Sequence, residues 1–360
     1  MENTVYREYS RIIAESEKWF RFSDRVFMEQ LNIDTLFERV NSKNFVRLMF
    51  FYENLVQLIP KVKFPKKREF HTVSAFLLGI LLKDKLKMST RSLPDPCKNH
   101  KKSFIYFWSM ICLSHDLTFW LESNEEYLIK CNTLEKFYQE FNIKYRLIDE
   151  SYFGQLFGDY YRYNIEQRGL IDHGITCGII LYDQLMKRYV ESTNRSGIVL
   201  TNDQWKYNKK FKEYALRISE TIARHNIWVA DPENEKIYRD YNLHKLISSD
   251  PDFNKVKYSE QDSMLFLLGL VDTLEPIKCC TRNKEEYDVY DILKNIKIEC
   301  NSRKKSIHIY SEVYINSEIT DSWRSLEKWL NLTVEVANDN EVKISFEYEK
   351  ETEEFKILVA

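Results

Sequence analysis

Four histidines and two aspartates of this 360-residue chain could bind a divalent transition metal, and each lies in or beside an apolar segment. In chain order they are His71, the adjacent pair His115 and Asp116, His173, His225 and Asp272. Imidazole and carboxylate groups are common ligands of such metals. Burial of either group is costly unless a partner compensates it, and one metal cluster would compensate all six. The order and setting of these residues therefore predict a buried metal site and metal-assisted hydrolysis.

The elements that must position these side chains are expected to be helices. Each motif is part of an apolar run that is long for a strand and typical of a buried helix. We expect one motif from each of five helices to converge on the metal. The five runs are HTVSAFLLGILL, FIYFWSMICLSHDLTFWL, GLIDHGITCGIILYDQL, ISETIARHNIWV and SMLFLLGLVDTLEP.

The pattern changes after about residue 284, where alternating and β-branched segments predict strands. Two such segments precede DSWRSLEKWL, an amphipathic helix, and two follow it. With only 8 Gly and 7 Pro, the rest of the chain favours long helices. We therefore expect a mainly α fold with a small C-terminal α+β unit. The expected domains are an N-terminal helical segment (1–64) that packs on the core, a metal-binding helical domain (65–283) and a ββαββ-like domain (284–360).

The overall composition indicates which partners and which cellular compartment to expect. The net charge of −2 provides no overall field that would recruit nucleic acid or an acidic membrane. Seven cysteines, an odd number without a CxxC spacing, indicate free thiols and a reducing cytoplasm. The longest apolar runs reach about half of the roughly 20 residues that a membrane span needs, so no membrane association is expected.

The motif order H…HD…H…H…D resembles the HD superfamily of metal-dependent phosphohydrolases, across about residues 65–280. The contexts REFHTVSAFLLGI, LSHDLTFWLE, DHGITCGIIL, ETIARHNIW and LFLLGLVDTLE resemble the motifs of bacterial HD-domain proteins. The resemblance implies an HD-type helical bundle. It also implies that a first metal ion is bound by four residues: His71, His115, Asp116 and Asp272.

In two-metal members of this superfamily, further histidines bind a second ion. The resemblance gives that role to His173 and His225, with Asp116 bridging both ions and the pair His115 and Asp116 at the catalytic centre. Many two-metal members have another histidine where this chain has Asn226, which leaves the second site with fewer protein ligands. The absence of a GYP motif argues against a cyclic di-GMP phosphodiesterase of the HD-GYP type.

The implied activity is hydrolysis of a phosphoester or phosphoanhydride bond, most plausibly in a nucleotide, by a metal-activated water. A mixed nitrogen and oxygen ligand set favours one or two ions of Mn, Fe, Ni or Zn. Arg91, Lys102, Arg224 and Asn226 are the candidates for substrate contacts. Two carboxylates, Asp172 and Glu275, together with Arg224, are candidates to orient the metal ligands, although most charged residues simply face water.

Several other readings stay open at this stage. Any one of the histidines could be a hydrogen-bonded core residue, and the ligands could survive in a protein that has lost catalysis. The chain could be a metal-dependent nuclease on single-stranded nucleic acid, an inactive nucleotide-binding sensor, or a di-iron oxygenase. Strand edges in the C-terminal unit could pair between subunits, which would give a homo-oligomer.

Overall fold

A computed structural model describes most of the chain. The described residues are 4–15, 66–89, 100–122, 124–195, 202–227, 235–247, 263–276, 293–311, 323–328, 330–338 and 341–346. The chain forms two compact units. The first comprises residues 1–54, 66–108 and 255–360, and the second comprises residues 55–65 and 109–254.

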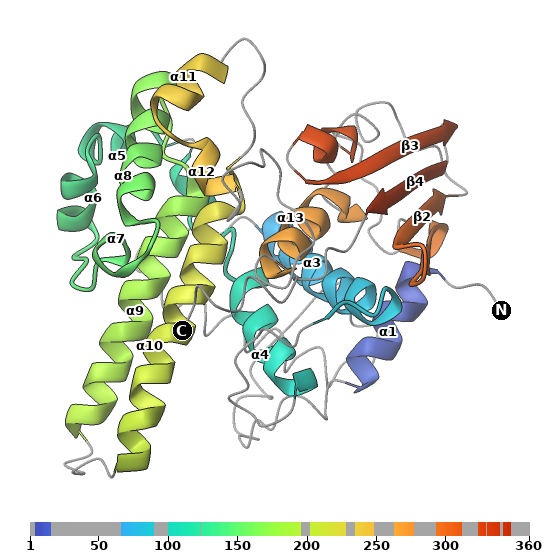
Figure 1. The fold of residues 1–360 in the computed structure, drawn as a ribbon, viewed down its shortest axis with the longest axis horizontal. Helices are drawn as coiled ribbons and strands as arrows, with labels where there is room; N and C mark the ends of the chain where they lie inside the picture. The colour runs from blue at the N-terminus through green and yellow to red at the C-terminus, as the bar shows by residue number, and fades with distance from the viewer. Residues whose placement is uncertain are drawn as a thin grey trace, which may run out of the picture. The chain divides into compact units, whose positions relative to one another are not determined.

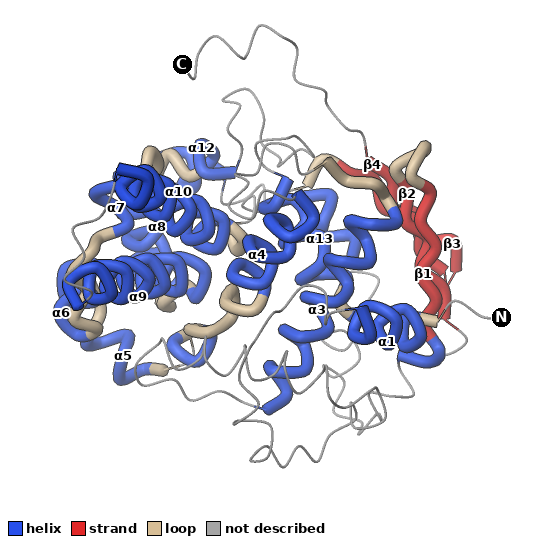
Figure 2. The backbone as a smooth tube through the Cα atoms, turned by 90° about the horizontal axis from the view of Figure 1, so that it is seen from below, coloured by secondary structure: helices blue, strands red, loops and turns tan. Residues whose placement is uncertain are grey.

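The first unit combines helices with a small antiparallel sheet (Figure 1). Its helices are α1 (Val5–Glu15), α3 (Lys66–Lys85), α13 (Ser263–Leu274) and the greater part of α4 (His100–Cys112). Its strands are β1 (Ile296–Asn301), β2 (Ser306–Ser311), β3 (Leu332–Asn338) and β4 (Glu341–Phe346), and the helical turn η7 (Ser325–Lys328) precedes β3. Figure 2 shows the strands edge-on, with α1 and α3 along one face of the sheet.

The sheet has the strand order β1-β2-β4-β3, and all of its pairs are antiparallel. Alternation along the strands explains why it has one apolar face. Ile298 pairs with Ile309, and Ile307 pairs with Ile344; all four side chains are buried. Lys343, between Val342 and Ile344 in β4, is exposed. Only the face that bears the isoleucines is therefore suited to pack on helices.

Close contacts fix α3 within the first unit. The indole of Trp108 in α4 donates to the carbonyl of Phe76, 2.9 Å away. Gly79 makes this possible, because a Cβ at that position would lie 2.1 Å from the Trp108 ring. On α1, the Tyr9 hydroxyl lies 3.1 Å from the hydroxyl of Ser74 in α3. These contacts make α3 a firm support for the side chains that it carries.

Helices, joined by turns and loops, are the only regular elements among the described residues of the second unit. It contains η4 (Phe119–Leu121), α5 (Glu125–Lys130), α6 (Leu134–Glu140), α7 (Leu147–Glu150), α8 (Gly154–Tyr163), a π-helical turn η5 (Asn164–Arg168), α9 (His173–Arg195), α10 (Asn202–Arg224), α11 (Glu235–Asp240) and α12 (His244–Ile247). The long helices α9 and α10 lie side by side (Figure 1). A Cβ on Gly178 would lie 2.6 Å from the carbonyl oxygen of Ser219, so the two helices approach closely there.

The predicted fold class is confirmed in its coarse form: the described chain is mainly helical, with a small four-stranded antiparallel sheet. The C-terminal order of two strands, a helical turn and two strands is also as expected. Within the described residues, no helix is long and apolar enough to cross a membrane. The three-domain division and the HD-type arrangement of the helices stay predictions.

The polar composition of residues 190–212 predicts a connection between helices, and most of that prediction is wrong. The helix α9 continues to Arg195, and α10 begins at Asn202. Lysine, glutamate and glutamine favour helices even where no apolar stripe marks them, which explains the difference. The helices expected within residues 31–59 lie outside the described part of the chain.

Candidate metal-binding residues

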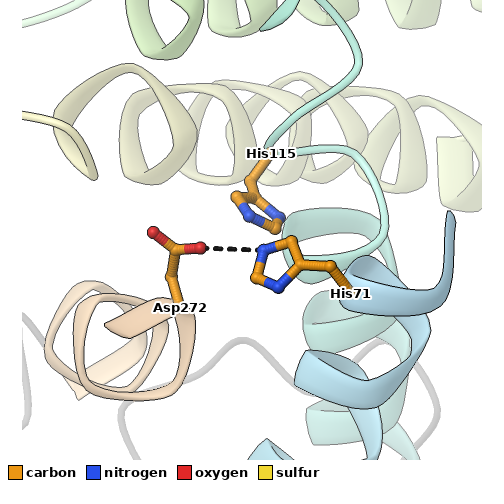
Figure 3. A group of neighbouring side chains, drawn as sticks. All are labelled: His71, His115 and Asp272. Atoms are coloured by element: carbon orange, nitrogen blue, oxygen red, sulfur yellow. Dashed lines mark hydrogen bonds and ion pairs between the residues drawn. The ribbon is translucent and has the colours of Figure 1, made fainter. Parts of the chain in front are cut away.

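In the first unit, His71 lies between two carboxylates: that of Asp272 in α13 and that of Glu275, the residue just after α13. Its Nδ1 is 2.9 Å from Oε2 of Glu275, and its Nε2 is 3.0 Å from Oδ1 of Asp272 (Figure 3). His71 and Glu275 are buried, whereas the Asp272 side chain keeps 14% of its exposure. His115, also drawn in Figure 3, belongs to the second unit and is described with it.

This geometry fits a metal-binding histidine. An ionised carboxylate only accepts hydrogen bonds, so the Glu275 contact calls for a proton on Nδ1 and directs Nε2 toward Asp272. Two ligands at right angles around an ion with bonds of about 2.1 Å are about 3.0 Å apart. The separation between Nε2 of His71 and Oδ1 of Asp272 is 3.0 Å, so these two atoms could bind one ion.

In the second unit, the expectation that helices carry these motifs is wrong for His115, Asp116 and His225, which lie in turns just after α4 and α10. The rings of His115 and His225 are held in the same way. Nδ1 of His115 lies 2.6 Å from the carbonyl oxygen of Cys112, and Nδ1 of His225 lies 2.7 Å from that of Ile222. Near the end of a helix, a carbonyl lacks the usual donor four residues further on, so it can accept from a ring N–H. A carbonyl can only accept, which places the proton on Nδ1 and the lone pair on Nε2 in both rings. Nε2 is therefore the nitrogen available to a metal.

Asp116 provides the carboxylate of this second set. Its Oδ1 is 3.6 Å from Nε2 of His115 and 3.2 Å from Nε2 of His173. The candidate ligand atoms of His115, Asp116 and His225 all lie within 4.8 Å of one another, and all three residues are buried. Three ligands spread evenly around one ion with bonds of about 2.1 Å are about 3.6 Å apart, so the wider separations would have to contract by up to about 1.2 Å before the three could share an ion.

His173 is the first residue of α9, and Glu122 holds it. The carboxylate oxygen Oε1 of Glu122 accepts from the backbone N–H of His173 at 3.2 Å and also makes a short contact with Nδ1 of its ring. Burial alone would lower the His173 pKa, but hydrogen bonds to Asp116 and Glu122 raise it to about 10. Burial would raise the Glu122 pKa, yet the bonds to His173 leave it lowered. The two carboxylates thus favour a positive charge on the imidazole of His173.

The two expected orienting carboxylates have different roles. Glu275 contacts Nδ1 of His71, one of the candidate ligands, and its role in orienting a metal ligand stays a prediction. Asp172 is the residue before α9, and its Oδ1 accepts from the backbone N–H of Ile175 at 3.1 Å. Its Oδ2 accepts from Nδ2 of Asn226 at 2.7 Å and from the Tyr160 hydroxyl at 3.0 Å. Burial raises the Asp172 pKa.

The structure describes two of the four expected substrate-contact side chains. Arg224 is buried; it donates to the carbonyl oxygens of Leu246 and Ile247, and its guanidinium lies over the Phe153 ring. Those contacts hold α12 and compensate the charge. Asn226 donates to Asp172. The substrate role of both stays a prediction. Arg91 and the side chain of Lys102 lie outside the described part of the chain.

Glu122 is one of the residues that sequence reasoning missed. It lies six positions after Asp116, within the segment HDLTFWLE that had already been singled out. The sequence did offer a signal for this residue, because Glu122 lies beside an apolar run that contains candidate ligands. Its contact with His173 matches the contact of Glu275 with His71: in each pair, a glutamate binds Nδ1 and an aspartate faces Nε2.

Comparisons with known proteins found no match: no family model, no curated protein and no solved structure matches the chain. The resemblance to the HD superfamily therefore depends on the motif residues alone. What those residues can do must be argued from their geometry.

Proposed function

We propose that this chain is a metal-dependent phosphohydrolase of the HD type that cleaves a phosphoester or phosphoanhydride bond of a nucleotide. The observation that carries the proposal is the repeated carboxylate–imidazole–carboxylate arrangement, Glu275–His71–Asp272 in one unit and Glu122–His173–Asp116 in the other. A histidine that binds a metal through one ring nitrogen commonly donates its other ring N–H to a carboxylate. This hydrogen bond fixes the tautomer and the ring orientation.

The residues fit a divalent transition metal on two further grounds. The donors are imidazole nitrogens and carboxylate oxygens, a set suited to Mn, Fe, Ni or Zn. His115, Asp116 and His225 are buried together, which is costly for an uncompensated carboxylate. When bound, the ions would supply Lewis-acid activation of water and of a phosphoryl oxygen.

The ligand roles in this proposal are those that the HD resemblance implies. It assigns His71, His115, Asp116 and Asp272 to a first ion, and His173 and His225 to a second. Glu275 and Glu122 hold His71 and His173 in one tautomer. Helix-end carbonyls do the same for His115 and His225. These contacts orient the Nε2 atom of each of the four histidines within its own unit.

The test is elemental analysis of the purified chain together with a screen of nucleotide and phosphodiester substrates. We expect about two ions per chain, metal-dependent release of phosphate or nucleoside, and loss of both in Asp116→Ala. The matched control is Asp159→Ala, because Asp159 pairs with Arg162 at the surface of α8. Metal content in Asp116→Ala equal to that of the wild type would refute the site. Metal and tight nucleotide binding without turnover would point to the sensor instead.

A further inference from the structure

A largely buried hydrogen-bonded cluster joins the start of α9 to the end of α10, next to two of the candidate ligands. Asp172 immediately precedes His173, and Asn226 immediately follows His225. Nδ2 of Asn226 donates to Oδ2 of Asp172 at 2.7 Å. The Tyr160 hydroxyl lies 3.0 Å from the same oxygen and 3.2 Å from the backbone carbonyl of Asn226. Tyr160 and Asp172 are almost fully buried.

We propose that Tyr160, Asp172 and Asn226 form a clamp that positions the imidazoles of His173 and His225 for a shared ligand. The inference rests on the proposed metal-binding function and extends it to residues that are not among the proposed metal ligands. The two rings have centroids 5.1 Å apart. Each ring belongs to a residue that is adjacent in the chain to a clamp residue. The hydrogen bond between Asp172 and Asn226 therefore limits how far the two helix ends can separate.

The surrounding packing supports this role. Gly174 lies at the same junction, where a Cβ would be 3.1 Å from Oδ1 of Asp172, 3.2 Å from Nδ1 of His225 and 3.3 Å from Cβ of Asn226. The helix ends therefore meet without spare space, and a small displacement of one is transmitted to the other. Metal sites respond to such displacements, since loss of one outer contact typically reduces metal affinity by about 10–100-fold.

The variant Asp172→Asn distinguishes the clamp role of Asp172 from its role in capping α9. Asparagine caps a helix about as well as aspartate, so Oδ1 can still accept from Ile175. Its new Nδ2, however, would face the donating Nδ2 of Asn226. The reciprocal double variant Asp172→Asn/Asn226→Asp restores a donor opposite an acceptor and keeps the net charge.

The matched control is Asp183→Asn on the same helix. Asp183 is also fully buried, and its Oδ1 accepts from the backbone N–H groups of Lys144 and Tyr145. A general loss of α9 stability would appear in both variants. A loss of ligand positioning would appear only in Asp172→Asn.

The experiment has two readouts on the full chain: the imidazole proton–nitrogen NMR correlations after chelation, and the Kd for Mn²⁺ alone. For Asp172→Asn we expect shifted signals of His173 and His225 and a Kd weakened at least about tenfold. We expect wild-type signals and Kd in Asp183→Asn, and recovery in the double variant. Tyr160→Phe, which removes only a hydroxyl, should shift the same signals and covers the case in which Asp172→Asn does not fold.

Unchanged imidazole signals in folded Asp172→Asn, or equal changes in Asp183→Asn, would overturn the clamp. Failure of the proposed function looks different, because the wild type would then bind no Mn²⁺. The imidazole signals would still decide the clamp in that case.

Discussion

Glu122 binds His173 twice: one carboxylate oxygen accepts from the backbone N–H and also contacts Nδ1 of the ring. The backbone contact fixes where α9 begins, and the ring contact fixes how the imidazole is turned. Both contacts act on His173. Among the described residues of α9, this is the side chain that pairs with Asp116. Glu122 thus connects a helix start to the orientation of a candidate metal ligand.

Replacing Glu122 tests this connection. In Glu122→Gln the neutral amide retains an acceptor but loses the charge that raises the His173 pKa. We expect the affinity for Mn²⁺ to fall by about 10–100-fold, measured by isothermal titration. Glu126→Gln is the control, because Glu126 is exposed and pairs with Lys130 on the surface of α5. An unchanged Kd in Glu122→Gln would show that this contact does not support a ligand.

Gly174→Ala should damage the site more than the fold. The new methyl group would press on Asp172 and on the His225 ring at 3.1 and 3.2 Å, so one of them must shift by a few tenths of an ångström. We expect weaker Mn²⁺ binding with a small change in the free energy of unfolding. Gly158→Ala in α8 meets no atom within 4 Å and should stabilise the chain by about 0.5–1 kcal/mol with unchanged binding. Equal Mn²⁺ affinities in both variants would contradict the tight packing.

Gly79→Ala tests the packing of α3 on α4 in the first unit. The added Cβ would overlap the Trp108 ring at 2.1 Å and push the indole away from the Phe76 carbonyl. Overpacking of this kind costs about 1–3 kcal/mol. Urea unfolding followed by tryptophan fluorescence should show a lower midpoint. A midpoint at or above the wild-type value would mean that α3 and α4 separate without cost.

Acid should destabilise the contact between α1 and α3. Burial would raise the Glu8 pKa, but hydrogen bonds and charges from Lys85 and Arg11 leave it lowered. A carboxyl whose pKa is lowered on folding stabilises the fold above its unfolded pKa, and that contribution disappears as the pH falls through the folded pKa. The thermal midpoint of the wild type should therefore fall more steeply below about pH 4.5 than that of Glu8→Gln. Parallel curves for the two proteins would refute this role of Glu8.

The sequence predicted the helices that carry the candidate ligands better than it predicted how those ligands are held. Long apolar runs identify α9 and α13 because burial leaves a local signal. The sequence did not indicate that His115 and His225 lie just beyond helix ends, where helix-end carbonyls accept hydrogen bonds from their Nδ1–H groups. Glu122 and Tyr160 were missed because their partners are 51 and 12 residues away, and hydrogen bonds across such separations leave no periodicity.

Binding of Mn²⁺ should stabilise the chain through His225. A ligand that binds only the folded state raises its stability by about 2.7 kcal/mol at a hundred times its Kd. We expect Mn²⁺ to raise the Tm of the chelator-treated wild type, and this increment to be lost or greatly reduced in His225→Ala. His244→Ala is the control, because His244 is a half-exposed histidine of α12 in the same unit. The comparison uses the Mn²⁺-induced increment rather than Tm itself, so any loss of packing in His225→Ala cancels. A full increment in His225→Ala would remove His225 from the ligand set, and a loss in both variants would indicate non-specific binding to imidazoles.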